Sequence, residues 1–271
     1  MSERPIGVFD SGVGGLTVVR ELWRRMPDES VVYFGDTARV PYGPKSPDTV
    51  RRFAREAAAF LLSREVKLVV VACNTATAHA LDILLEELEV PVIGVIEPGA
   101  RAAVAATRSG RIGVIGTVGT IASGAYDREV RRLLPSASIF AQPCPLFVPL
   151  IEEGWLDHPA TRLIAEEYLR PLCDVEVDVL VLGCTHYPLL RPVLQQIVAP
   201  STVLVDSAEE TVLEVRRVLE ARELLRNSPP PVHTFAVSDS PLRFRQVGRH
   251  FLGDALLEIE LVSVDGYDRA A

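Results

Sequence analysis

The sequence contains few residues of several types, and each shortage argues against a class of protein. Only two of the 271 residues are lysine and only four are cysteine. No two cysteines have C-x-x-C spacing, which argues against a thioredoxin-like redox site and against a zinc knuckle. No apolar run approaches the roughly 20 residues that span a bilayer. The first residues also lack the layout of a signal peptide. We therefore expect a cytoplasmic protein with reduced cysteines and no membrane segment.

The charge pattern is also informative. The formal net charge is −8 at pH 7, and no basic run or cluster of stacking aromatic residues is present, so we expect no nucleic-acid partner. The arginines are scattered over segments such as 20–25 and 214–226. This distribution is typical of solvated helix faces.

Short β-rich runs alternate with longer amphipathic segments along the chain. The runs cover residues 6–10, 30–36, 67–73, 90–97, 111–117, 136–142, 177–184 and 202–207. Runs this apolar are typical of parallel strands that are covered on both faces. The segments between them, such as 46–64 and 158–174, have helical patterns. The alternation predicts an α/β protein built from βαβ units.

The second half of the pattern repeats the first half. IGVFDSGVGG (6–15) aligns with IGVIGTVGTI (112–121) at an offset of 106, and VKLVVVACNT aligns with VDVLVLGCTH at an offset of 111. We therefore predict two pseudo-symmetric, doubly wound parallel-sheet units with the active site in the cleft between them. The first unit comprises residues 1–97 plus 208–271, and the second comprises 98–207, with the break near 97–110.

The tail after the second unit is too short to form a domain of its own. It contains a helical pattern (208–226), a Pro-rich turn (227–232), a strand pattern (233–239), another helical pattern and a final apolar run (256–264). We expect this tail to pack against the first unit.

Cys73 and Cys184 occupy equivalent places in the two units, each at the carboxyl end of a predicted strand. Open α/β sheets bind their ligands at that edge. Small polar residues follow both cysteines and could cap the next helix, and a helix N-terminus lowers the pKa of a thiol. Cys144 and Cys173 have no such setting, so we interpret them as packing residues.

Two thiols on opposite sides of one cleft suit the inversion of a carbon centre. One base removes a proton from one face while an acid delivers a proton to the other face, and thiols with modest pKa shifts can divide these roles. Many amino-acid racemases use pyridoxal phosphate bound to a lysine instead. Lys67 begins a buried strand and Lys45 lies in a Pro-rich loop, so neither is a suitable attachment site for pyridoxal phosphate. The pattern favours a mechanism without a cofactor.

Motifs along almost the whole chain resemble those of the glutamate racemase family of cofactor-independent amino-acid racemases, in the family's order and spacing. They are FDSGVGGLTV (9–18), YFGDTARVPYG (33–43), ACNTATA (72–78), GVIEPG (94–99), GVIGTVGTI (113–121), PLFVPLIEEG (145–154) and GCTHYPLL (183–190).

The resemblance implies a role for each matching residue. Cys73 and Cys184 would be the two acid/base thiols, with Asp10 assisting near Cys73 and with His186 and Glu152 near Cys184. The residues that would line the substrate site are Asp10, Ser11, Tyr42, Gly43, Asn74, Thr75, Thr185 and His186. The implied reaction is the interconversion of L- and D-glutamate, which supplies peptidoglycan synthesis, in a protein that forms a homodimer. His79, by contrast, we interpret as structural, and His158, His233 and His250 match no motif.

Other functions remain open at this point. The paired cysteines would serve equally for aspartate or a hydantoin, and a non-catalytic amino-acid-binding protein could share the fold. DSGVGG is not a dinucleotide loop, because Thr17 stands at the third glycine position. Its glycines we interpret as allowing backbone amides to approach a small anion. A metal site at Cys73, Cys184 and His186 would lack a fourth ligand at a suitable spacing, so we expect no metal.

Overall fold

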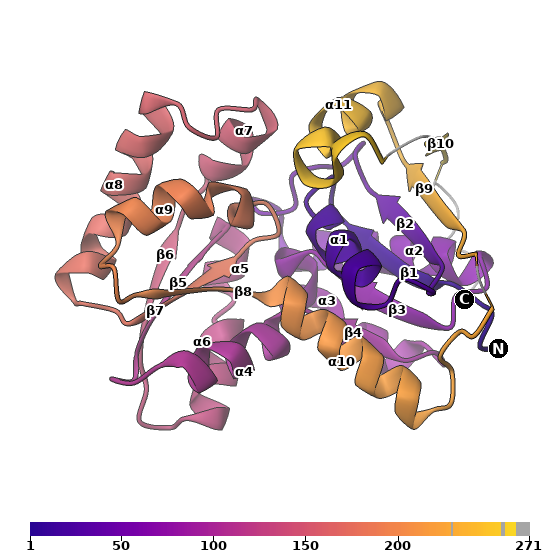
Figure 1. Cartoon of the computed structure of the whole chain (residues 1–271), viewed down its shortest axis with the longest axis horizontal. Helices are drawn as coiled ribbons and strands as arrows, with labels where there is room; N and C mark the ends of the chain where they lie inside the picture. Colours follow the sequence, from indigo (N-terminus) through magenta and orange to yellow (C-terminus); the bar gives the residue numbers. More distant parts are fainter. Residues whose placement is uncertain (229, 256–257, 264–271) are drawn as a thin grey trace.

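The computed structural model describes residues 1–228, 230–255 and 258–263, and within them it contains two fully parallel sheets (Figure 1). The strands of the first sheet lie in the order β10 (Glu260–Leu261), β9 (His233–Val237), β2 (Val31–Gly35), β1 (Ile6–Asp10), β3 (Leu68–Val71) and β4 (Val92–Gly94). Those of the second lie in the order β6 (Ser138–Pro143), β5 (Arg111–Gly116), β7 (Val179–Gly183) and β8 (Val203–Asp206). The predicted pair of α/β units is confirmed.

The strand order also supports the internal duplication. The first four strands of the chain are arranged as β2-β1-β3-β4, and the next four as β6-β5-β7-β8, which is the same order. Asp10 pairs with Gly35 at the carboxyl end of β1, and Gly116 pairs with Gly183 at the equivalent place in the second sheet. The loops that follow β1, β3, β5 and β7 are therefore in equivalent positions in the two units.

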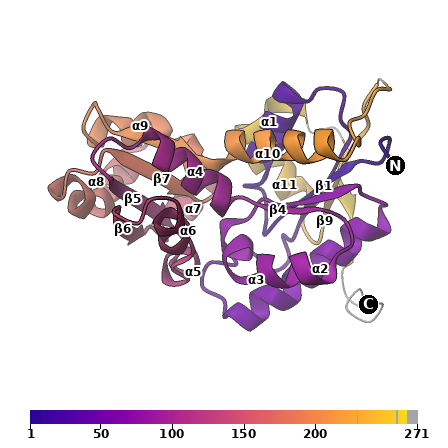
Figure 2. The same cartoon turned by 90° about the horizontal axis from the view of Figure 1, so that it is seen from below.

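Helices cover both faces of the sheets, as Figures 1 and 2 show. Those in the first half of the chain are α1 (Leu16–Arg25), α2 (Pro47–Ser63), α3 (Asn74–Glu87), α4 (Ile96–Ala106), α5 (Val118–Ala122) and α6 (Ala125–Leu133). Those in the second half are α7 (Phe147–Glu152), α8 (Pro159–Asp174), α9 (Arg191–Ile197), α10 (Ser207–Ala221) and α11 (Pro241–Leu252), with short 3₁₀ turns η1 (Tyr187–Leu190) and η2 (Gly253–Ala255). In the first unit α2 and α3 pack together on one face, and α1 packs with α10 and α11 on the other.

The central strands form because their side chains are buried on both faces. Every residue of β1, β2, β3 and β7 is buried, as the continuous apolar runs predict. β6 differs because it is an edge strand, and its six residues are all exposed or half-buried.

The tail packs against the first unit, as predicted: β9 pairs in parallel with β2, and α11 packs against α1. The predicted helix 208–226 is shorter in the structure, because α10 ends at Ala221 and Glu223 has a left-handed φ of 55°. Residues 256, 257 and 264 of the final apolar run lie outside the described residues.

The segment near which we place the break between the units forms α4. Pro98 is tolerated there because it lies in the first turn, and the alanines that follow favour a helix. α4 packs against α6 and β7 of the second unit, and α10 packs against both α1 of the first unit and α4. These contacts are compatible with boundaries at 97/98 and 207/208, which remain a prediction.

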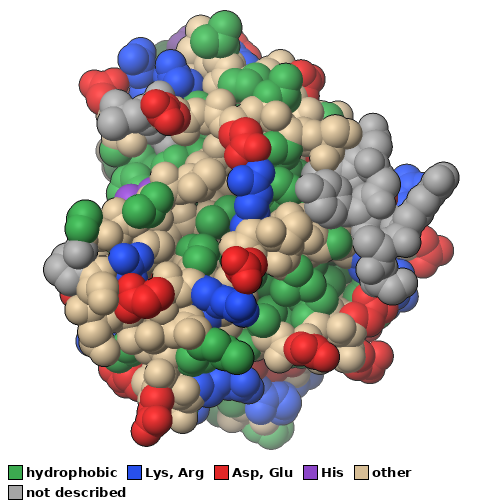
Figure 3. Space-filling model, turned by 90° about the vertical axis from the view of Figure 1, so that its right-hand side faces the viewer, with side chains coloured by type: hydrophobic (Ala, Val, Ile, Leu, Met, Phe, Trp, Pro, Cys, Tyr) green, Lys and Arg blue, Asp and Glu red, His purple; other side chains and the backbone are tan. Residues whose placement is uncertain are grey.

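The surface carries charges of both signs close together. Figure 3 shows Lys and Arg next to Asp and Glu on the face at the end of the first unit. Pairs such as Arg4–Glu65 and Arg64–Glu260 place the arginines beside carboxylates. Among the described residues, no helix is long and apolar enough to cross a membrane.

Candidate active site

A small cavity lies where the carboxyl ends of the central strands of the two units meet. It has a volume of about 30 Å³, which is enough for about two water molecules. Its walls are formed by Ser11, Val40, Pro41, Tyr42, Gly43, Cys73, Asn74, Thr75, Thr117, Val148, Cys184, Thr185 and His186. Nine of the eleven predicted site residues are among them. The other two, Asp10 and Glu152, lie behind the wall and contact residues that line it.

Cys73 approaches the cavity from the first unit. It is the N-cap residue of α3, where its Sγ accepts a hydrogen bond from the N–H of Ala76 at 3.4 Å and donates to the hydroxyl of Ser11 at 3.7 Å. Burial, together with the nearby Asp10 carboxylate, nevertheless raises the pKa of Cys73 to about 12. The expected lowering of this pKa is therefore wrong, because one backbone N–H offsets only part of the desolvation of a buried thiolate.

Cys184 approaches the cavity from the second unit, and its nearest titratable partner is His186. Nδ1 of His186 lies 3.9 Å from Sγ of Cys184, and Nε2 lies 3.0 Å from Oε1 of Glu152. Burial alone would lower the pKa of His186, but its hydrogen bonds to Cys184 and Glu152 raise it to about 10. These contacts therefore favour the protonated, cationic form of the ring. The 3₁₀ turn η1 follows here rather than the α-helix that we expected after Cys184.

Asp10 links the two units behind the cavity wall. Its side chain is 1% exposed, accepts the N–H of Gly12 at 2.9 Å and accepts the hydroxyl of Thr185, from the second unit, at 3.4 Å. Burial raises the pKa of Asp10, although the charge of His186 opposes the shift.

The glycines of DSGVGG also have a steric use that we did not predict, while the approach of their amides to a ligand anion remains a prediction. The amide of Gly12 is already bonded to Asp10. At Gly14, an added Cβ would lie 2.2 Å from Oγ1 of Thr185 and 2.4 Å from Nδ1 of His186. Gly14 thus provides the space into which the second unit inserts these two side chains.

Asn74 lines the cavity and carries a buried, unpaired donor. Its Oδ1 accepts the hydroxyl of Tyr126, from α6 of the second unit, at 2.7 Å. Its Nδ2 is buried, and no described residue accepts a hydrogen bond from it. A buried N–H₂ group without a partner is costly, so an acceptor such as a carboxylate would be stabilised at this point.

Three threonine hydroxyls meet across the boundary between the units. Thr75 lies 2.8 Å from Thr117 and 3.2 Å from Thr120, measured between the Oγ1 atoms. Thr117 also lines the cavity, although it is not among the predicted site residues. The internal duplication could have identified Thr117 as a site residue, because the offset of 106 aligns it with Ser11.

Tyr42 and Gly43 belong to the loop that closes the cavity on the first unit. The hydroxyl of Tyr42 donates to Asp36 at 2.5 Å, and its ring packs against Phe53. Any contact between Tyr42 and a ligand would therefore come from its backbone. The carbonyl of Gly43 accepts the N–H of Gly119 from the second unit at 2.8 Å, which holds the loop against α5.

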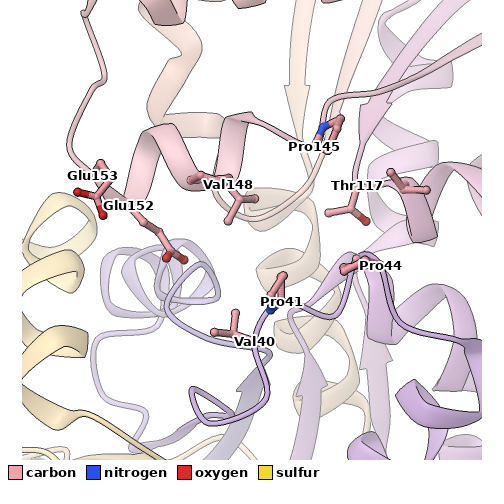
Figure 4. A pocket seen from close by; sticks show the side chains of 11 residues that line it. Val40, Pro41, Pro44, Thr117, Pro145, Val148, Glu152 and Glu153 are labelled. Atoms are coloured by element: carbon pink, nitrogen blue, oxygen red, sulfur yellow. The ribbon is translucent and has the colours of Figure 1, made fainter.

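A larger hollow of about 350 Å³ adjoins the cavity, and Val40, Pro41, Gly43, Thr117 and Val148 line both spaces. In Figure 4, Val40, Pro41 and Pro44 rise from the first unit toward Val148 and Pro145 of the second. Glu152 and Glu153 stand at one end of the hollow (Figure 4). This hollow is a mainly apolar approach to the polar cavity.

The two lysines lie away from this chemistry. Lys67 precedes β3 at its amino end, and its Nζ pairs with Glu29 at 2.6 Å and donates to two backbone carbonyls. Lys45 follows the loop of Tyr42 and lies 5.9 Å from the ring of Phe53. In the part of the chain that the structure describes, no three His, Cys, Asp or Glu side chains are grouped as metal ligands would be.

Comparison with known proteins identifies close relatives of this chain. Residues 12–215 match the family described as Asp/Glu/Hydantoin racemase. A protein of Syntrophus aciditrophicus named glutamate racemase is 54% identical over 96% of this chain and 97% of its own length.

Solved structures agree with the sequence comparison. A glutamate racemase of Francisella tularensis, crystallised with D-glutamate, is 40% identical and superimposes with a TM-score of 0.93 over 98% of this chain and 100% of its own. A glutamate racemase of Thermus thermophilus, crystallised with β-chloro-D-alanine, is 47% identical with a TM-score of 0.88 over 97% of this chain and 98% of its own.

Proposed function

This chain belongs to the Asp/Glu/hydantoin racemase family, and on that premise we propose that it is a glutamate racemase that interconverts L- and D-glutamate without a cofactor. One observation carries the proposal. Cys73 and Cys184 follow equivalent strands of two duplicated units, and both line the same small cavity. A site that only bound an amino acid would not need two opposed thiols.

The reaction moves one proton off the α-carbon and another onto it. A thiolate on one side removes the Cα proton and becomes a thiol, leaving a carbanion that the substrate carboxylate stabilises. The thiol on the other side then donates its proton to the opposite face and becomes a thiolate. The product has the inverted configuration, and the next turnover can run in the reverse direction.

The two thiols have different surroundings, which divides these roles at the start of a turnover. Burial and Asp10 hold Cys73 as the neutral thiol, because they raise its pKa to about 12. The imidazolium of His186 lies 3.9 Å from the sulfur of Cys184 and stabilises negative charge there. Glu152 in turn stabilises the imidazolium at 3.0 Å. Asp10 thus acts on the protonation of Cys73, whereas His186 and Glu152 place a positive charge beside the sulfur of Cys184.

The polar wall of the cavity suits an amino acid with a second carboxylate. The unpaired Nδ2 of Asn74 and the hydroxyl of Ser11, which accepts from Cys73 and keeps its own proton, are candidate donors for carboxylate oxygens. The loop of Tyr42 and Gly43 adds backbone groups. Since the cavity holds about two waters, it must widen to admit glutamate.

The test is to incubate the purified protein with L-glutamate in heavy water and no added cofactor. D-glutamate with deuterium at Cα should appear. Cys73→Ser and Cys184→Ser should each reduce racemisation by at least about 100-fold, since each removes one acid/base group. Absence of D-glutamate from the wild-type reaction, or full activity of either variant, would reject the mechanism.

L-aspartate and a hydantoin are the controls for substrate choice, because the same pair of thiols could act on them. Faster deuterium incorporation into either one than into glutamate would replace the proposed substrate while keeping the mechanism.

The proposed setting of this activity is the cytoplasm, where D-glutamate is supplied for peptidoglycan synthesis. We propose a homodimer of chains that each contain a complete site, since both cysteines come from one chain. Light scattering of the purified protein tests the oligomeric state independently of activity.

A further inference from the structure

The C-terminal helix α11 belongs to the tail that packs on the first unit, yet it reaches the second unit beside the active site. Figure 1 shows α11 and α7 facing each other across the boundary between the units. Arg243 of α11 pairs with Glu153 at 2.6 Å and donates to the backbone carbonyl of Glu152 at 3.5 Å. Near the end of α11, His250 lies against the turn at Gly154.

Phe251, also on α11, contacts His186 directly. Phe251 is 3% exposed, and its ring meets the ring of His186 edge to face, with centroids 5.6 Å apart and planes at 87°. His186 makes its two polar contacts through its ring nitrogens: Nε2 bonds Glu152, and Nδ1 contacts Cys184. The imidazole can still turn about its Cβ–Cγ bond within the slack of these two contacts, since the sulfur is 3.9 Å away and Glu152 is partly exposed. A buried aromatic ring that packs edge to face against the imidazole restricts this rotation further.

Glu152, the partner of His186, is less firmly held. Its side chain is 26% exposed, and a hollow of about 250 Å³ separates it from Phe244 and Val247 of α11. The Arg243–Glu153 pair that spans this hollow is largely exposed, and exposed ion pairs contribute little. The carboxylate side alone therefore does not hold His186 rigidly, and the buried Phe251 adds a second constraint on the ring.

We propose that Phe251 is a positioning residue for the acid/base chemistry on the Cys184 side: it fixes the ring plane of His186, so that Nδ1 faces the sulfur while Nε2 faces Glu152. This inference rests on the proposed function. It assigns to the C-terminal tail of the first unit a role in the catalytic machinery of the second. The position of α11 on the first unit then also affects the geometry of His186.

The test compares Phe251→Ala with Val247→Ala. Val247 is on the same helix and is 4% exposed, but it has no ring next to His186. We expect Phe251→Ala to lower kcat by about 10- to 100-fold, part of the usual contribution of a general acid–base group, with KM for glutamate changed less than about 3-fold. Val247→Ala should keep kcat while losing some thermal stability.

A spectroscopic measurement separates positioning from loss of packing. In protein labelled with ¹⁵N-histidine, the hydrogen-bonded ring N–H of His186 is assigned by its absence in His186→Gln. This resonance should shift and exchange faster with water in Phe251→Ala and stay in place in Val247→Ala. If the alanine variant does not fold, Phe251→Leu should show the same changes at smaller size.

The outcomes separate this inference from the proposed function. Equal loss of kcat in Phe251→Ala and Val247→Ala, or an unmoved His186 resonance, would overturn the positioning role even with an active wild type. Failure of the wild type to racemise glutamate would reject the proposed function, while the His186 resonance would still report whether Phe251 orients the ring.

Discussion

Replacing Gly14 by alanine tests how closely the two units must approach at the active site. The added Cβ would lie 2.2 Å from Oγ1 of Thr185 and 2.4 Å from Nδ1 of His186, whereas ordinary contacts begin at 3.4 Å. His186 would have to retreat by about 1 Å, and Thr185 slightly further, relative to the loop after β1. A displacement of about 1 Å at a catalytic group can cost about 100-fold in rate, and overpacking of this kind costs about 1–3 kcal/mol of stability.

The assay is the rate of glutamate racemisation, followed by optical rotation, together with a thermal melt. We expect kcat of Gly14→Ala to fall by about 10- to 100-fold. Gly113→Ala is the matched control, because its Cβ would meet Leu180 at 3.1 Å within the sheet of the second unit, away from the cavity. It should lose stability but keep kcat. Wild-type kcat and KM in Gly14→Ala would refute the view that Gly14 sets the separation between the first unit and His186.

Three further predictions follow from buried polar contacts. Tyr126→Phe removes the hydroxyl that donates to Oδ1 of Asn74 at 2.7 Å. The amide of Asn74 can then rotate, so KM for glutamate should rise by about 5- to 10-fold, the effect of about 1 kcal/mol. An unchanged KM in steady-state kinetics would mean that Tyr126 does not orient Asn74. Lys67→Met leaves the carboxylate of Glu29 buried without its partner 2.6 Å away. The free energy of unfolding, measured in urea, should fall by about 3–5 kcal/mol while kcat is retained. The double variant with Glu29→Gln should recover part of this loss, and equal stability of the single and double variants would contradict the ion-pair explanation. Because the pKa of His186 is raised from 6.5 to about 10, the stability that its charge contributes is complete below about pH 6.5 and is lost as the pH rises toward 10. The difference in melting temperature between wild type and His186→Gln should therefore shrink over that range. A difference that does not depend on pH would contradict the raised pKa of His186.

Much of the fold could be predicted from the sequence, because buried parallel strands require continuous apolar runs. The runs at 6–10 and 177–184 coincide closely with β1 and β7. The alignment at an offset of 111 placed Cys73 and Cys184 at equivalent strand ends. Since ligands of open α/β sheets bind at that edge, the two thiols could be expected in one cleft before any coordinates were known.

What the tertiary structure alone decided are the contacts between the two units, since these join residues far apart in the chain. Sequence gave no sign that Tyr126 bonds Asn74 or that Phe251 meets His186. The pKa of Cys73 could not be predicted either, because the local helix N-terminus lowers it while burial in the closed cleft raises it more. Local patterns determine strands, caps and motifs, whereas burial and partner choice depend on how the two units pack together.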